Sequence, residues 1–260
     1  MSQVLLEVRG LRKSFGGLRA VSGVDLDVAA GGITGLIGPN GAGKSTLFNL
    51  IAGALRPDGG SIRLGGEEVA GEPPHRLFAR GLVRTFQIPR PFHGLTLVEN
   101  LMAVPGGDGA ERLVSSWLHR RRIAAREAAL RERALEVLRI LALDRVAGQR
   151  AGELSGGQKK LLELGRVMMA EPRIVLLDEI GAGVNRTLLG ELASHIERLN
   201  RDRGITFLVI EHDMDLIARL CEPVVVMAEG QVLTRGSMAE LRRDPRVIEA
   251  YLGARAAHAA

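Results

Sequence analysis

The sequence has little cysteine, few aromatic residues and no long apolar run, and each shortage excludes a class of protein. Its 260 residues contain a single cysteine, Cys221, which can neither pair within the chain nor complete a cysteine-based zinc site. Aromatic residues make up 3% of the chain, too few to favour a platform that stacks the bases of single-stranded nucleic acid. No apolar run approaches the roughly 18 residues that a membrane-spanning helix needs, and the N-terminus lacks the apolar stretch of a secretory signal. We therefore expect a chain of a reducing compartment that does not bind nucleic acid and reaches a membrane only through partners.

The order of the expected elements indicates an α/β fold. Apolar residues alternate with period two over residues 4–8 and 24–28, which predicts a β-rich N-terminal part. Short apolar runs typical of buried strands occur at residues 33–37, 174–177 and 207–210, and segments with helical spacing separate them. Strands that alternate with helices predict a mostly parallel sheet.

A segment rich in arginine, alanine and leucine separates these two groups of strands. Between residues 96 and 152 the apolar residues recur at helical spacing, which predicts a helical lobe. Residues 111–150 hold ten arginines and five acidic residues, a net +5 that equals the net charge of the whole chain. Alternating arginine and glutamate are typical of a solvated helix face. Contact with acidic loops of a membrane partner or with anionic lipid is the alternative.

A glycine-rich loop follows the expected strand at residues 33–37 and matches the pattern GxxxxGK[ST]. It consists of Gly38, Pro39, Asn40, Gly41, Ala42, Gly43, Lys44, Ser45 and Thr46. Glycines let successive backbone N–H groups and the following helix N-terminus face a polyphosphate. Lys44 is expected to reach the β- and γ-phosphate oxygens, and the Ser45 hydroxyl to bind Mg²⁺. The loop therefore predicts nucleotide binding.

Two acidic residues follow the apolar run at residues 174–177. Asp178, at the end of a buried parallel strand, is suited to hold Mg²⁺ through its water shell, and Glu179 is suited to polarise an attacking water. An ordinary surface acid pair after a core strand is the alternative for this segment alone. The glycine-rich loop earlier in the chain favours the catalytic interpretation.

The segment Leu154–Gln158 reads LSGGQ and opens an expected helix, which makes it a second anion site. With this motif the chain resembles the ATP-binding-cassette (ABC) ATPases, whose signature sequence is LSGGQ. The resemblance extends over almost the whole chain, because the remaining motifs follow in the family's order. They are the glycine-rich loop (Walker A), Gln87 after a strand, the signature, the strand ending in Asp178 and Glu179 (Walker B), and His212 after a further strand.

The resemblance implies how the chain binds ATP. In ABC ATPases two nucleotide domains pair head to tail, and each ATP lies between the Walker A loop of one domain and the signature of the other. The signature residues Ser155, Gly156, Gly157 and Gln158 are thus implied to face the ATP held by Lys44 of the other copy, with Ser155 and Gly157 on the γ-phosphate. Phe15 corresponds to the aromatic residue that stacks on adenine, although a lone Phe is also common in a core.

The resemblance also implies the catalytic roles. Glu179 would be the base, His212 would contact the γ-phosphate in its own subunit, and Gln87 would touch Mg²⁺ or the lytic water. A solvated turn residue is the alternative for His212. After Glu179 the family usually has proline, and its next loop ends in Asn-Pro or Asp-Pro; here Ile180 and residues 181–186 lack both prolines. We expect this loop to be less rigid, with Asn185 still reaching across the dimer.

The implied fold is a P-loop NTPase (RecA-like) core with an N-terminal antiparallel β subdomain and an α-helical signature subdomain. We expect one nucleotide-binding domain over residues 1–260. Its parts are the β subdomain and core (1–92 and 159–242), the helical subdomain (93–158), and a C-terminal helix and tail (243–260).

Several stretches resemble one branch, the cytoplasmic ATPases of branched-chain amino-acid importers. They are residues 15–18 (FGGL), 84–87 (RTFQ), 94–100, 210–214 (IEHDM) and 246–253. One departure is Gly156, where members often carry tyrosine. The branch implies a homodimer or a heterodimer with a paralogous ATPase, two integral-membrane permeases, an extracytoplasmic binding protein, and a place on the inner face of the cell membrane. A urea importer, a lipopolysaccharide or lipid exporter, and a soluble ABC ATPase acting on DNA or ribosomes are the alternatives.

Overall fold

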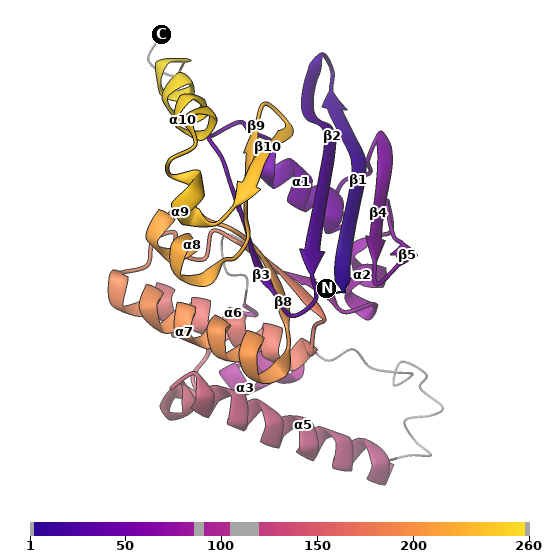
Figure 1. Cartoon of the computed structure of the whole chain (residues 1–260). Helices are drawn as coiled ribbons and strands as arrows, with labels where there is room; N and C mark the ends of the chain where they lie inside the picture. The colour runs from indigo at the N-terminus through magenta and orange to yellow at the C-terminus, as the bar shows by residue number, and fades with distance from the viewer. Residues whose placement is uncertain (1–2, 86–90, 105–119, 258–260) are drawn as a thin grey trace. The chain divides into compact units, whose positions relative to one another are not determined.

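The computed structural model describes residues 3–85, 91–104 and 120–257 and divides into two compact units (Figure 1). The first unit comprises Met1–Gln87 and Pro172–Ala260, and the second comprises Ile88–Glu171. The first unit contains two sheets and the second is built from helices.

A four-stranded antiparallel sheet holds the N-terminal part of the first unit. Its strands are β1 (Val4–Phe15), β2 (Leu18–Ala29), β4 (Gly59–Leu64) and β5 (Glu67–Glu68), in the order β2-β1-β4-β5. The strands β1 and β2 are longer than the alternation predicts, because their register shifts between Val8 and Leu11, around Gly10. Gly10 has a φ of 55°, so it forms a bulge that interrupts the period-two pattern and leaves the pairing intact on either side.

A six-stranded sheet forms the second layer of this unit, in the order β10-β9-β3-β8-β7-β6. Its strands are β3 (Ile33–Ile37), β6 (Leu82–Arg84), β7 (Ile174–Asp178), β8 (Thr206–Ile210), β9 (Val224–Ala228) and β10 (Gln231–Gly236). All neighbours pair in parallel except β9 and β10. The predicted mostly parallel sheet is confirmed, and every residue of β3, β7 and β8 is buried.

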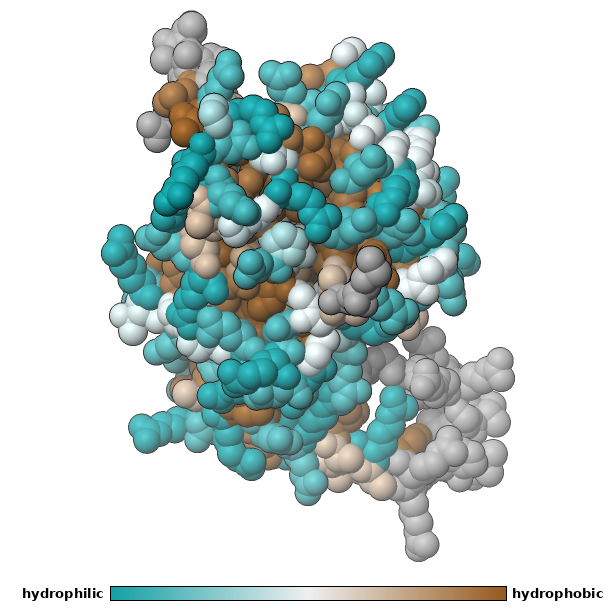
Figure 2. Space-filling view, in the orientation of Figure 1, coloured by the Kyte–Doolittle hydropathy of each residue, from teal (hydrophilic) through white to brown (hydrophobic). Residues whose placement is uncertain are grey.

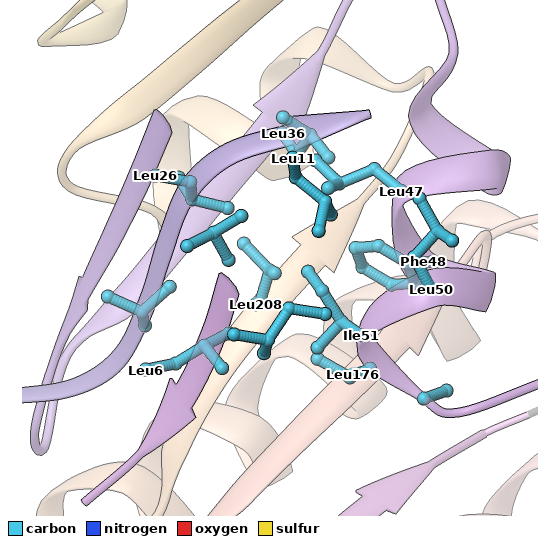
Figure 3. Close-up of a cluster of buried hydrophobic side chains, with 14 of the residues drawn as sticks. Leu6, Leu11, Leu26, Leu36, Leu47, Phe48, Leu50, Ile51, Leu176 and Leu208 are labelled. Atoms are coloured by element: carbon cyan, nitrogen blue, oxygen red, sulfur yellow. The ribbon is translucent and has the colours of Figure 1, made fainter. Parts of the chain in front are cut away.

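The helix α1 (Lys44–Ile51) packs in the core between the two sheets (Figure 3). Its side chains Leu47, Phe48, Leu50 and Ile51 meet leucines of β1 and β2 on one side and of β3, β7 and β8 on the other. Full burial of each such side chain contributes about 1.5–3 kcal/mol. This packing fixes the start of α1, and therefore the loop before it, against both sheets.

The remaining helices of the first unit are α2 (Pro74–Ala79), α7 (Arg186–Arg203), α8 (Met214–Leu220), α9 (Met238–Leu241) and α10 (Pro245–Ala257). The helices α7 and α8 contact each other, and α8 also contacts β3.

Figure 2 shows apolar surface along α10, where Ile248 and Leu252 are 46% and 60% exposed. None of the helices in the described parts of the chain is both long enough and apolar enough to cross a membrane.

The second unit is the helical lobe. It contains α3 (Leu97–Met102), α5 (Arg120–Ile140), two short 3₁₀ turns (Asp144–Val146 and Ala151–Glu153) and α6 (Gly156–Ala170). The unit ends at Glu171 rather than at residue 158, because α6 packs against α3 and α5. Gly165 of α6 permits this approach: a Cβ there would lie 3.0–3.3 Å from Leu141, Leu101 and Val137.

Candidate functional site

Three neighbouring parallel strands of the first unit deliver the polar residues of the site. The strands β3, β8 and β7 lie side by side. After their carboxyl ends come the glycine-rich loop (38–43), the pair Glu211 and His212, and the pair Asp178 and Glu179. Because the carboxyl ends of parallel strands meet at one edge of a sheet, this edge is where an α/β protein binds its ligand.

The backbone of the glycine-rich loop admits no larger side chain at its two ends. A Cβ on Gly38 would lie 2.1 Å from the carbonyl oxygen of Met227, and one on Gly43 would lie 2.2 Å from that of Ala20. Gly43 has a φ of 95° and serves as the N-cap of α1 without a side-chain cap. The first N–H groups of α1 therefore keep their capacity to bind an anion.

Lys44 is folded back over this loop. Its Nζ donates to the carbonyl oxygens of Gly38 at 2.7 Å and Pro39 at 3.0 Å, and the residue is 6% exposed. Burial lowers the pKa of Lys44, while the negative charges of Glu179 and Asp178 act in the opposite direction. The ammonium group thus interacts electrostatically with both the acid expected to be the catalytic base, Glu179, and the acid expected to hold Mg²⁺, Asp178. Ser45, next along α1, is exposed.

Glu179 and His212 form a pair at this edge. Glu179 Oε1 lies 3.0 Å from His212 Nε2, and the two side chains are 21% and 51% exposed. Glu179 has a φ of 50°, a left-handed conformation that costs a non-glycine residue on the order of 1–3 kcal/mol. Its N–H donates to the carbonyl oxygen of Ile210 at 2.9 Å, which links β7 to β8 at the point where the backbone turns. With the backbone in this conformation, the Glu179 carboxylate pairs with His212.

Glu211 is a buried acid, and the sequence indicates it only as part of the IEHDM stretch of one branch. It is 4% exposed, and its carboxylate accepts hydrogen bonds from the N–H groups of Gly181 at 2.6 Å and His212 at 3.1 Å. Burial raises the pKa of Glu211; the N–H groups of Gly181, His212 and Asp213 lower it, and the charge of Glu179 raises it further. Glu211 also raises the pKa of Cys221, which burial brings to about 12.

The loop after Glu179 is held by hydrogen bonds where the family usually has prolines. The Glu211 carboxylate binds Gly181, and the Val184 N–H donates to the Gly181 carbonyl at 3.1 Å. Asn185 is the N-cap of α7 and accepts from the Leu188 N–H at 2.9 Å. The Glu211 carboxylate, at the end of the neighbouring strand β8, therefore positions this loop. No single motif in the sequence indicates this contact.

The ionisation of Glu211 should make stability depend on pH. Because its folded pKa is raised, its contribution to stability is complete below the ordinary value of 4.5 and is lost as pH rises through the folded pKa. We expect the unfolding free energy of Glu211→Gln, relative to the unaltered chain, to increase with pH from about 4.5 upward. Urea unfolding at intervals from pH 3.5 to pH 8 measures this difference.

Glu240 supplies a control of opposite sign. Its carboxylate accepts from Ser237 at 2.8 and 2.9 Å, and these bonds lower its pKa. Its contribution is present above the ordinary pKa and lost as pH falls through the folded value, so Glu240→Gln should lose stability relative to the unaltered chain as pH rises. A Glu211→Gln difference that is flat with pH would contradict the burial argument.

Arg84 is a second site residue that was not predicted from the sequence. It ends β6, which pairs with β7, and its Nη2 donates to Asp178 Oδ2 at 2.8 Å. Asp178 itself is 7% exposed, so this ion pair is largely shielded from water. The signal in the sequence was a charged residue at the end of a short apolar strand, immediately before the Thr85-Phe86-Gln87 segment.

Two further predicted residues are Phe15, in the first unit, and Gln87. Phe15 ends β1 in the β1–β2 hairpin and is 47% exposed. Lys13 Nζ lies 5.7 Å from the centroid of the Phe15 ring and 2.7 Å from Asp58 Oδ1. The exposed ring is open to a ligand, so a core role is excluded. Gln87 lies outside the described residues.

The signature residues belong to the second unit. Ser155 is the N-cap of α6, and it forms a capping box with Gln158: the Ser155 side chain accepts from the Gln158 N–H, and the Gln158 side chain from the Ser155 N–H. Nothing lies within 4 Å of a Cβ on Gly156, so the tyrosine common in the resembling branch has space here. The capped start of α6 is solvent-exposed at Ser155 and Gly156.

The donors at the strand edge suit Mg²⁺. Among the described residues, no three His, Cys, Asp or Glu side chains are grouped to hold a metal. The Ser45 hydroxyl and the Asp178 carboxylate are hard oxygen donors, and Mg²⁺ is usually held by one or two such groups together with water and substrate phosphates. The site therefore fits a Mg²⁺ that arrives with a nucleotide.

Comparison with known proteins gives matches over nearly the whole chain. The model of the ABC transporter family matches residues 21–182, and a model described as branched-chain amino acid ATP-binding cassette transporter matches residues 231–257. The chain is 41% identical to the high-affinity branched-chain amino acid transport ATP-binding protein BraF of Pseudomonas aeruginosa, over 97% of this chain and 99% of that protein. It is 38% identical to the probable branched-chain amino acid transport ATP-binding protein LivG of Archaeoglobus fulgidus, over 96% of each.

Two solved structures support the same fold. One is the ADP conformation of MJ1267, an ATP-binding cassette of an ABC transporter, with a TM-score of 0.83 and 36% identity over 97% of this chain and 100% of that one. The other is a nucleotide-free ATP-binding cassette from an ABC transporter, with a TM-score of 0.82 and 35% identity over 95% and 98%. The predicted P-loop NTPase fold is confirmed by these neighbours.

Proposed function

Because this chain belongs to the ABC transporter family of ATPases, we propose that it is the ATP-hydrolysing subunit of an importer for branched-chain amino acids. The observation that carries the chemistry is the cluster of Lys44, Asp178, Glu179 and His212 at the edge of the parallel sheet. The names of the BraF and LivG relatives, together with the match over residues 231–257, support branched-chain amino acids as the transported substrate.

The proposed binding step uses the glycine-rich loop. The backbone N–H groups of residues 40–46 face the β- and γ-phosphates of ATP, and Lys44 exchanges its two carbonyl partners for phosphate oxygens. Ser45, Asp178 and Gln87 would hold Mg²⁺, which when bound neutralises charge on the phosphates. Phe15 stacks on the adenine.

The proposed hydrolytic step uses the Glu179–His212 pair. Glu179 accepts the proton of the attacking water, and His212 keeps the carboxylate oriented and contacts the γ-phosphate. Glu211 holds both the His212 N–H and the loop after Glu179, so it positions the pair without touching substrate. Ser155 and Gly157 of a second copy, or of a paralogue, complete the site from the N-terminus of α6.

The proposed partners are two permeases and an extracytoplasmic binding protein, with the chain on the inner face of the cell membrane.

Uptake of radiolabelled leucine, isoleucine and valine by a strain that lacks this gene tests the proposed function. We expect uptake to fall and to return with the unaltered gene but not with the Glu179→Gln gene. Normal uptake of all three amino acids together with loss of urea uptake would assign the chain to the alternative importer.

Replacing Phe15 by Ala should weaken ATP binding about tenfold, because stacking a base on an aromatic ring contributes about 1–3 kcal/mol. ATP and GTP should lose affinity to a similar extent, since every base offers a face for stacking. Titration with fluorescent nucleotide analogues measures both. The control is Phe78→Ala, a phenylalanine of α2 that is 38% exposed; an equal loss in both variants would contradict the stacking role.

A further inference from the structure

We propose that Arg84 is the positioning residue of the Mg²⁺ site, and this proposal rests on the proposed role of Asp178 in that site. Arg84 Nη2 donates to Asp178 Oδ2 at 2.8 Å, and Nη1 donates to Asn49 Oδ1 at 2.5 Å. One guanidinium group thus connects the end of β7 with the helix α1.

The two partners of Arg84 belong to the two elements that carry the expected Mg²⁺ donors. Asn49 lies four residues after Ser45 on α1, so both side chains project from the same face of that helix. Asp178 ends β7. The planar guanidinium, whose N–H groups have fixed directions, therefore sets the distance between the Ser45 helix and the Asp178 carboxylate.

The burial of the bridge makes it stiff. The Arg84 and Asp178 side chains are 19% and 10% exposed, so water competes little for either charge. The Arg84 Nε is buried and has no hydrogen-bond partner within the described part of the chain. The orientation of the guanidinium is thus set by Asn49 and Asp178.

The bond to Arg84 uses one of the two Asp178 carboxylate oxygens. Oδ1 is thereby presented in a fixed direction, which is the condition for a carboxylate to hold the water shell of an octahedral cation. Thr85 adds a second restraint, because its Oγ1 accepts from the Asp178 N–H at 3.4 Å. The strand end that carries Asp178 is thus fixed through both backbone and side chain by consecutive residues of the β6 segment.

The test measures the gain in nucleotide affinity that Mg²⁺ produces, using a fluorescent non-hydrolysable ATP analogue in Mg²⁺ and in EDTA. Arg84→Met should reduce that gain about tenfold, because Asp178 loses the charge-assisted hydrogen bond that fixes the direction of its carboxylate. Affinity in EDTA should change less than about twofold. Arg84→Lys keeps the charge and reaches one partner, so we expect it to recover part of the gain.

The matched control is Arg219→Met, which removes an arginine bound to Glu197 on the surface of the same unit and should leave the gain unchanged. Asn49→Ala should lower the gain in the same direction as Arg84→Met, and the double variant should be no worse than Arg84→Met alone. Equal loss of affinity in Mg²⁺ and in EDTA would show a purely structural role and overturn the proposal. A larger gain in Arg84→Met would show that Arg84 competes with the cation and would overturn it too.

The unaltered chain and Asp178→Asn separate this proposal from the one it rests on. If Mg²⁺ gives the unaltered chain no gain, or if Asp178→Asn keeps the gain, the Mg²⁺ role of Asp178 is wrong. If both behave as expected and Arg84→Met also keeps the full gain, only the positioning role of Arg84 is wrong.

Discussion

Replacing Glu179 by Gln is expected to lower kcat for ATP hydrolysis at least 100-fold while leaving ATP affinity nearly unchanged. A general base contributes about 10²–10⁴-fold to a rate, and an amide cannot accept the proton of the attacking water. Gln keeps the size of the side chain and can still pair with His212 Nε2, now 3.0 Å from the Glu179 oxygen. The geometry of the site is therefore preserved and only the proton acceptor is lost.

Phosphate release under saturating ATP measures the rate, and the dimer is followed by size-exclusion chromatography with and without ATP. Because ATP would join two copies until it is hydrolysed, Glu179→Gln should accumulate as a dimer in ATP. Glu171 provides the matched control: it is also a glutamate with a left-handed backbone, at φ 48°, but it ends α6 and pairs with Arg133. A Glu179→Gln variant that turns over within a few-fold of the unaltered chain would disprove the base assignment.

The central part of this site could be predicted because it depends on local sequence patterns. The short, mostly apolar runs at residues 33–37 and 174–177 became β3 and β7 almost residue for residue. Parallel strands bring their carboxyl ends to one edge, so a prediction of strand type was enough to bring Lys44, Asp178 and His212 together. The motif order made the family prediction possible, and the family matches confirmed it.

Features that depend on contacts between distant segments could not be predicted. Gly10 breaks the alternation of β1 at a bulge, so the pattern indicated a shorter strand than the one that pairs with β2. Residue 158 looked like the end of the helical subdomain because the signature ends there, but the packing of Gly165 against Leu101 and Leu141 assigns α6 to the helical unit. Packing partners of a helix are not encoded in its own periodicity.

Arg84 and Glu211 show the same limit within the site. Each is a charged residue next to a short apolar strand, and nothing in its local sequence reports its partner. The partners lie 94 residues away for Arg84 and Asp178, and 30 residues away for Glu211 and Gly181. Only the parallel order of β6, β7 and β8 brings these charges beside the residues that they position.

Replacing Lys44 by Met should weaken ATP binding about 100-fold, or about 2.7 kcal/mol, with little change in the stability of the fold. The loss follows from the hydrogen bonds of an ammonium group to two phosphates, each of which contributes about 1.5–3 kcal/mol. The fold should tolerate the change because Lys44 is buried, and burial already lowers its pKa by penalising the charged form. An apolar side chain of similar length removes that penalty but leaves the Gly38 and Pro39 carbonyl oxygens without their donor, so the two effects oppose each other and the net change in stability should be small.

Two readouts separate binding from folding for this variant. Thermal unfolding without nucleotide should give a Tm for Lys44→Met close to that of the unaltered chain, while the rise in Tm produced by ATP should disappear. Lys44→Arg is the charge-preserving control; its larger planar group must fit where Nζ now lies 2.7 Å from the Gly38 oxygen, so it should restore only part of the affinity. Unchanged ATP affinity in Lys44→Met would contradict the assignment of the glycine-rich loop as the phosphate site, and with it the chemistry proposed for Asp178 and Glu179.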